Sequence, residues 1–129
     1  MKKLSLGVLN FMPNATEYME TIRAALAAES HLIDLLPIRL KSHEYRSSKQ
    51  EVASYPVFDE LMQRGPLDML LVTGAPVEHL PYEDIQYFEE LNDIFAHAQQ
   101  RISSIMGLCF GGLALAKYLG IDKRVVKDK

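Results

Sequence analysis

The residues most able to do chemistry surround Cys109, the only cysteine in the chain. It lies between an apolar stretch, Ile105–Leu108, and a glycine pair, Gly111 and Gly112, that opens a helical pattern. This order is typical of a nucleophile elbow, a sharp strand-to-helix turn that projects a side chain from the carboxyl edge of a sheet. The following helix places N–H groups near the sulfur, which favours a thiolate. The alternative is a free cysteine that packs as a small hydrophobic side chain.

A cysteine nucleophile also needs hydrogen-bond donors for the oxyanion that forms when it attacks a carbonyl group. The loop that begins at Gly74 follows an apolar run, so it should lie on the same edge as Cys109. We expect the backbone N–H of Gly74 or Ala75 to be one donor, and that of Phe110 to be the second. The alternative for Gly74 is an ordinary turn glycine.

The base that would activate the cysteine is less evident, because the four histidines are scattered. His79 lies in the loop after Gly74 and is a candidate base, although chance loop histidines are common. His43 lies in a polar loop. His31 starts an expected strand and His97 ends an expected helix, so we expect both at the surface. With one cysteine and no close-spaced histidine pair, we expect no metal site.

Other polar side chains have two possible roles. Glu78, in the same loop, could narrow or polarise an acyl pocket, or it could be a solvated acid. The polar run Tyr45, Arg46, Ser47 and Ser48 could bind a carboxylate or phosphate, but such a run is also common on a solvated surface. The sequence pattern leaves both alternatives open.

Composition excludes several classes of function. The net charge is −3 with no basic stripe, so we expect no nucleic-acid partner. No apolar run is long enough for a signal peptide or a membrane span. One cysteine cannot form an internal disulfide, which suits a reducing, cytoplasmic location. With 129 residues, 48% of them hydrophobic, we expect a single domain over residues 1–129.

Apolar runs alternate with helical patterns along the whole chain. We expect strands at Leu4–Phe11, His31–Ile38, Asp68–Thr73 and Arg101–Leu108, and long helices at Glu83–Gln99 and Gly111–Tyr118. Further helices should begin at Asn14, paired with Glu17, and at Ser48, paired with Glu51. Pro56 should break the second of these helices, and the charged tail 121–129 has no packing pattern. The alternation predicts an α/β fold with a parallel sheet and helices on both faces.

Several blocks of sequence together resemble one family, the homoserine O-acyltransferases of the trans-succinylase type. The blocks are Val8–Pro13, His43–Arg46, Val72–Tyr82, Tyr87–Leu91 and the stretch from Ser103 through Cys109 to Ile121. They occur in the family's order and at its spacing. The resemblance implies a flavodoxin-like fold similar to class I glutamine amidotransferases. It covers the N-terminal half of a family member's catalytic domain, so the chain looks truncated.

The resemblance also implies a reaction. Cys109 would accept an acyl group from acyl-CoA as a thioester and pass it to the hydroxyl of homoserine or serine, in methionine or cysteine biosynthesis. Pro13 and Glu78 would lie at the acyl site, and Glu78 stands where acetyl-CoA users tend to have Glu and succinyl-CoA users Gly. We therefore expect acetyl-CoA rather than succinyl-CoA as donor substrate, and no bound cofactor. The family's catalytic His and Glu belong to the C-terminal half.

Two departures from the family pattern matter. Ala15 stands where family members usually carry a Lys, and Val52 where they tend to have a His. One alternative is therefore a non-catalytic fragment, or a module that depends on a partner to complete the site. Another is a different elbow enzyme, such as a glutaminase or amidase, but Thr73–Tyr82 matches the acyltransferases far better. Because a truncated sheet leaves apolar surface open, we expect a homo-oligomer.

Overall fold

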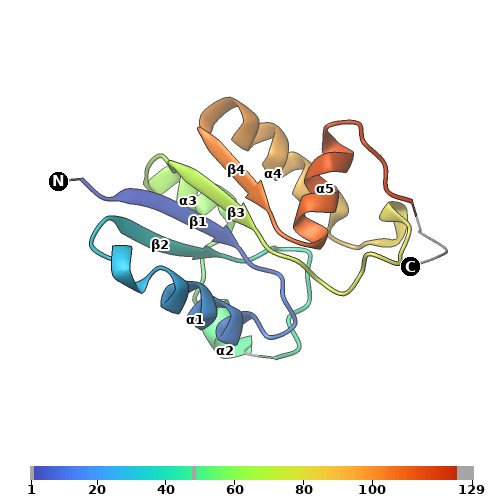
Figure 1. Ribbon diagram of the computed structural model, residues 1–129. Coiled ribbons are helices and arrows are strands. Elements are labelled where there is room, and N and C mark those ends of the chain that lie inside the picture. Colours follow the sequence, from blue (N-terminus) through green and yellow to red (C-terminus); the bar gives the residue numbers. More distant parts are fainter. Residues whose placement is uncertain (1, 48, 125–129) are drawn as a thin grey trace.

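Four parallel strands form one sheet in the computed structural model, which describes residues 2–47 and 49–124. β1 (Leu4–Leu9) lies between β2 (Ile33–Ile38) and β3 (Met69–Val72), and β4 (Ser104–Gly107) pairs with β3 (Figure 1). The order β2-β1-β3-β4 is that of the first four strands of a flavodoxin-like sheet. The α/β class and the parallel sheet predicted from the sequence are confirmed.

The strands end level with one another along one edge of the sheet. Leu9 pairs with Ile38 on one side and with Val72 on the other, and Val72 pairs with Gly107. Because all four strands are parallel, the loops that follow them leave from this carboxyl edge, where open α/β sheets bind their ligands.

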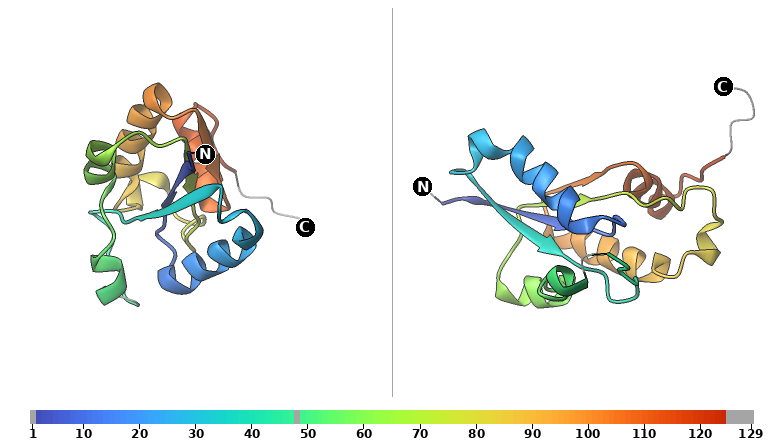
Figure 2. Two further views of the ribbon diagram at one scale, coloured as in Figure 1. Left: turned by 90° about the vertical axis from the view of Figure 1, so that its left-hand side faces the viewer. Right: turned by 90° about the horizontal axis from the view of Figure 1, so that it is seen from below.

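Helices cover both faces of the sheet, as predicted. α1 lies on one side, whereas α3 and α4 lie on the other (Figure 2), and α5 packs on β4 and α4. α2 contacts α1. The helices are α1 (Ala15–Ala25), α2 (Lys49–Ala53), α3 (Phe58–Arg64), α4 (Phe88–Arg101) and α5 (Phe110–Tyr118), with 3₁₀ turns at Ala27–Glu29 and Tyr82–Asp84.

Side chains alternate along each strand between two hydrophobic cores. The smaller core lies under α1 and contains Val8, Met19 and Ile22. The larger core lies under α3, α4 and α5; its fully buried members include Leu9, Leu70, Val72, Leu91 and Phe95. The last residues of β1, β2 and β3, which are Leu9, Ile38 and Val72, are fully buried, so packing fixes these strand ends at the carboxyl edge.

One face of the sheet stays open over β3 and β4, next to α1. Met106 is 61% exposed there. A hollow of about 350 Å³ lies beside it, lined mainly by apolar side chains such as Leu26, Met69 and Leu71. Within the described residues β4 pairs only with β3, so its outer edge is free. No helix in the described ranges combines the length and the hydrophobicity needed to cross a membrane.

Some predicted boundaries are wrong, for local reasons. The first strand ends at Leu9 rather than Phe11, because the Asn10 side chain bonds to Met12 N–H and to the Ala15 carbonyl and turns the chain. The second starts at Ile33, because Leu32 N–H closes a turn onto Glu29.

The predicted helix Glu83–Gln99 is a 3₁₀ turn followed by α4, since Ile85 between them is extended. Asn14 makes no capping bond to the backbone of α1, and its amide lies 3.5 Å from the Glu17 carboxylate instead. Ser48 lies outside the described residues. The break predicted at Pro56 is confirmed, because α2 ends at Ala53 and α3 begins at Phe58.

Candidate active site

Cys109 lies at the turn between β4 and α5 with an unusual backbone conformation. Its φ is 53° and its ψ is −123°, and it is the only non-glycine with positive φ among the described residues. Such a conformation costs about 1–3 kcal/mol and persists only where the surrounding structure enforces it. The side chain is exposed. The turn therefore presents the sulfur to solvent at the carboxyl edge, as a nucleophile elbow does.

Glycines allow β4 and α5 to pack closely enough to enforce this turn. A Cβ on Gly107 would lie 2.6 Å from the Gly111 carbonyl oxygen, and a Cβ on Gly111 would clash with the carbonyl oxygens of Val72 and Thr73. The Gly111 N–H bonds to the Leu108 carbonyl at 2.8 Å. No side chain fits at either glycine without backbone movement, so the small residues are a steric requirement of the elbow.

The two loops predicted to supply oxyanion donors lie next to each other. A Cβ on Gly74 would be 2.9 Å from the Cys109 Cβ and 3.4 Å from the Phe110 nitrogen. In the described part of the chain, the N–H groups of Gly74, Ala75 and Phe110 donate to no acceptor. Backbone donors that are free and adjacent to a nucleophile suit an oxyanion hole. Their role there remains a prediction.

Two buried polar residues at the strand ends were not predicted as part of the site. Asn10 and Thr73 are fully buried. The Asn10 amide donates to the Ala15 carbonyl at 2.8 Å, and the Thr73 hydroxyl accepts a bond from Phe11 N–H at 3.1 Å. The first bond holds the loop after β1 onto the start of α1, and the second ties this loop to the end of β3 beside the elbow. The signal was available, because each residue directly follows an apolar run.

Tyr18 of α1 also lies near the elbow. Burial raises the pKa of its phenol, and the charge of Cys109 raises it further. Electrostatic influence of this kind requires proximity. The sequence pattern did not indicate this electrostatic effect of Cys109 on Tyr18.

A hollow of about 560 Å³ opens at the carboxyl edge between three loops. Pro13 and Ala75, both predicted site residues, line it, together with Tyr87 at the start of α4. Arg46 and the neighbouring residues of the polar loop also line it. Ala75 directly follows Gly74, and Gly74 lies against Cys109. The hollow therefore begins next to the elbow.

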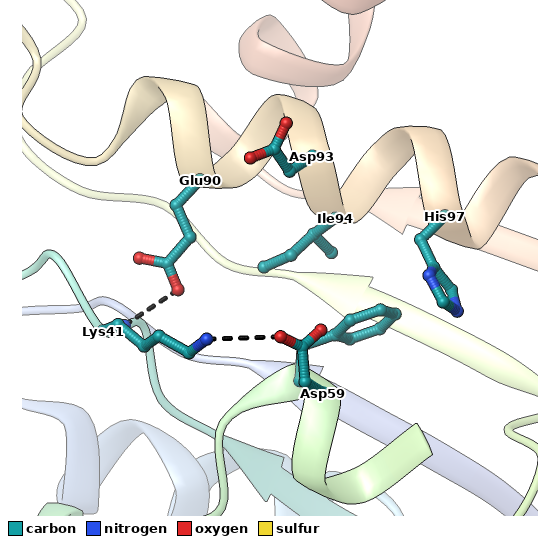
Figure 3. A pocket seen from close by; sticks show the side chains of 7 residues that line it. Lys41, Asp59, Glu90, Asp93, Ile94 and His97 are labelled. Atoms are coloured by element: carbon teal, nitrogen blue, oxygen red, sulfur yellow. Dashed lines mark hydrogen bonds and ion pairs between the residues drawn. The ribbon is translucent and has the colours of Figure 1, made fainter. Parts of the chain in front are cut away.

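The polar loop 41–47 is held at its start by Glu90. The Glu90 carboxylate accepts bonds from the N–H groups of Lys41 and Ser42, both at 2.8 Å, and from the Ser42 hydroxyl at 2.6 Å. Figure 3 shows Glu90 on α4 turned toward Lys41, whose ammonium group pairs with Asp59 at 3.2 Å. Charge-assisted bonds to main-chain N–H groups are strong, so Glu90 fixes the start of this loop.

Tyr45 fixes the middle of the same loop. Its hydroxyl donates to the Asn10 carbonyl at 2.6 Å and accepts a bond from Leu40 N–H at 3.1 Å. Burial raises the pKa of Tyr45 to about 12, so the phenol stays neutral. Tyr45 therefore holds the loop against the end of β1, a structural role that neither alternative for this polar run included.

Replacing Tyr45 with phenylalanine should destabilise the fold by about 1–2 kcal/mol, because two backbone groups would lose their partner. Tyr55→Phe is the matched control, since the Tyr55 side chain is half-buried and makes none of the hydrogen bonds found for Tyr45. Urea unfolding followed by circular dichroism measures both variants. Equal stability of the two variants would contradict the anchoring role of Tyr45.

The histidines do not form a dyad with Cys109. His79 is exposed, and no hydrogen bond in the described residues joins it to the cysteine. His43 is half-buried between the rings of Tyr45 and Tyr87, at 4.5 and 4.9 Å, and burial lowers its pKa against the opposing effects of Glu44 and Glu90. The described chain also holds no group of three His, Cys, Asp or Glu side chains that could bind a metal.

His97 was predicted to lie at the surface, and this prediction is wrong. It is half-buried on α4, edge-on to Phe58 of α3 at 5.5 Å, and its buried Nε2 has no partner in the described chain (Figure 3). It lines a small hollow together with Lys41 and Glu90 (Figure 3). His31 is exposed, as expected.

Glu78 is exposed and does not line the hollow. Its carbonyl accepts a bond from the Lys123 ammonium at 2.6 Å, and the same ammonium bonds to Leu80 and lies 4.5 Å from the centre of the Tyr82 ring. The charged tail 121–129 was expected to have no packing, but Lys123 of this tail binds the loop 74–82. Residues 125–129 of that tail lie outside the described part.

Comparisons with known proteins agree on one family. The model of the homoserine O-succinyltransferase family matches residues 1–129. The chain is 33% identical to a homoserine O-acetyltransferase of Dinoroseobacter shibae and 34% identical to one of Jannaschia sp., with 100% of this chain covered in both cases. A homoserine O-acetyltransferase of Ruegeria pomeroyi is 32% identical over the same span. The chain covers only 42–43% of the length of these relatives.

Proposed function

Because this chain belongs to the homoserine O-succinyltransferase family, we propose that it carries the nucleophilic half of an acyl-CoA:homoserine O-acyltransferase. The observation that carries the proposal is the conformation of Cys109: a strained, exposed cysteine next to free backbone donors. Folding alone gives no reason to keep a side chain in that conformation, whereas nucleophilic catalysis does.

The reaction would proceed in two steps. The Cys109 thiolate attacks the thioester carbonyl of acyl-CoA, and the carbonyl oxygen takes up negative charge. The N–H groups of Phe110 and of Gly74 or Ala75 would stabilise that oxyanion. Collapse of the intermediate breaks the bond to CoA, which leaves as its thiolate, and forms the acyl thioester on Cys109. The hydroxyl of homoserine then loses its proton to a base, attacks this thioester and regenerates the cysteine.

We propose acetyl-CoA as the donor. The similar proteins are named homoserine O-acetyltransferases, although the family carries the succinyl name. The resemblance places Glu78 at the acyl site, where a carboxylate would repel the free carboxylate of a succinyl group, although Glu78 does not line the hollow itself. The acceptor is homoserine or serine, which would place the reaction in methionine or cysteine biosynthesis. A free thiol nucleophile suits the reducing cytoplasm.

The base for the second step would come from outside these residues. No hydrogen bond joins His79 to Cys109 in the described residues, and the family's His and Glu, by resemblance, belong to the C-terminal part of a member. Since the chain covers 42–43% of its relatives, a non-catalytic or partner-dependent module is the second candidate. Transfer of the acyl group from acyl-CoA to Cys109 needs only the nucleophile and its oxyanion donors. The nucleophilic half of an enzyme should carry out this step, whereas a non-catalytic module should not.

Intact-protein mass spectrometry tests that first step. After incubation with acetyl-CoA, we expect the mass of one acetyl group on Cys109 and no adduct on the Cys109→Ser variant. The conditions must preserve both thioesters and esters, so that an acetyl group on either residue would be detected. Succinyl-CoA should react more slowly, and Glu78→Gly should narrow that difference. A folded chain that takes no acetyl group would favour the non-catalytic module. A donor preference that Glu78→Gly leaves unchanged would contradict the role of Glu78.

A further inference from the structure

The hollow beside the elbow has more room than the reacting groups need. Its volume of about 560 Å³ is in the range of small-molecule sites. An acetyl group and a small amino acid would leave much of it empty. The acyl-CoA donor is the larger substrate, because a long pantetheine arm separates its thioester from its phosphates. The size of the hollow therefore suits the donor better than the acceptor.

The lining changes in character along the hollow. Near the elbow it is mostly apolar, with Phe11 and Pro13 from the loop after β1 and Ala75 and Val77 from the loop after β3. Phe11 also lies edge-on to Phe110 at 6.2 Å, which links this end to the elbow helix. Apolar walls with a few backbone polar groups fit the arm of the donor.

The lining from the loop after β2 is charged, and β2 lies at the opposite edge of the sheet from β4 and the elbow. Arg46 is exposed there and forms no ion pair within the described residues. Glu44 also lines the hollow. Glu90 bonds the start of this loop, and the Tyr45 hydroxyl bonds to Asn10, so the backbone is anchored at the residue directly before Arg46 before any ligand binds. A guanidinium on a fixed loop is well suited to bind phosphate.

We propose that this hollow binds the pantetheine arm of the acyl-CoA donor and that Arg46 binds a phosphate at its outer end. The inference rests on the proposed function and assigns the donor side of the same site. The negative charge of Glu44 weakens the attraction of this site for phosphate. It does not abolish that attraction, since Arg46 can approach the anion directly. Glu90 and Tyr45 act as positioning residues for the loop.

The test compares a donor that has phosphates with one that has none. The rate of Cys109 acetylation is measured with subsaturating acetyl-CoA and with S-acetyl-N-acetylcysteamine, a short thioester without phosphate. Arg46→Met should slow acetylation by acetyl-CoA about tenfold and leave the short thioester unaffected. Arg64→Met is the matched control, because Arg64 is exposed at the end of α3, away from the hollow. Equal slowing with both donors would overturn the assignment.

Direct binding separates failure of this inference from failure of the proposed chemistry. Isothermal titration with coenzyme A itself requires no acetyl transfer. Arg46→Met should weaken this binding about tenfold, and Glu44→Gln should strengthen it. Those shifts would support the donor site even if Cys109 took no acetyl group. Absence of CoA binding to the unaltered chain, or loss of homoserine binding rather than CoA binding in Arg46→Met, would overturn the inference.

Discussion

Replacing Cys109 with serine should lower acyl transfer from acetyl-CoA to homoserine by at least about a thousandfold, because a neutral hydroxyl is a far poorer nucleophile than a thiolate. Serine has nearly the same shape, so the fold should be retained. The rate of CoA release in the presence of homoserine measures the loss in any preparation in which the unaltered protein turns over. A serine variant that keeps more than a tenth of the activity would rule out a cysteine thioester.

Glycine at the same position provides the matched control for folding. The φ of 53° at Cys109 is strained for any side chain but not for glycine. We therefore expect Cys109→Gly to be more stable than Cys109→Ser by about 1 kcal/mol, although both variants are inactive. Chemical denaturation measures the difference. Lower stability of the glycine variant would mean that the turn is not strained in solution.

Replacing Gly111 with alanine should destabilise the protein by about 3 kcal/mol. In most helices this change stabilises, since alanine is the better helix former by about 1 kcal/mol. At Gly111 the new methyl group would clash with the carbonyl oxygens of Val72 and Thr73, and these belong to the end of β3 and cannot turn aside. Relief requires α5 to move away from the sheet, which would also displace the elbow. Thermal unfolding measures the effect.

Gly112 is the control for Gly111, because it is the next residue of the same helix. A methyl group there would lie 3.2 Å from the Gly107 carbonyl oxygen, which is tight but not a clash. The helix-forming advantage of alanine should offset this contact, so Gly112→Ala should stay within about 1 kcal/mol of the unaltered protein. Similar losses for both variants would show that general crowding, not contact with β3, determines the packing of α5.

The fold could be predicted because its signals are local. Each buried strand is an apolar run bounded by a turn residue, and the glycines around Cys109 indicate a close strand-to-helix turn. Even the misplaced end of β1 had a local cause, since Asn10 turns the chain with its own side chain. Sequence pattern finds such features where neighbours along the chain determine the structure.

The parts of the site that were missed depend on contacts between distant residues. Glu90 lies 48 residues from Ser42, and nothing near either residue indicates that they bond. His97 resembles a residue at the end of an exposed helix until α3 places Phe58 against it. Tyr45 has the sequence context of a solvated loop, but the end of β1 uses its hydroxyl. Local pattern cannot rank the possible partners of a polar side chain.

The free edge of β4 determines where the sheet can grow. α5 follows β4 on the face that α4 occupies. A right-handed connection on that face leads to a position outside β4, because parallel strands are joined in that sense. A parallel strand added there, whatever segment supplies it, would end beside Cys109. Lateral extension of the sheet would thus bring new side chains to the cysteine without moving any part of the site described above.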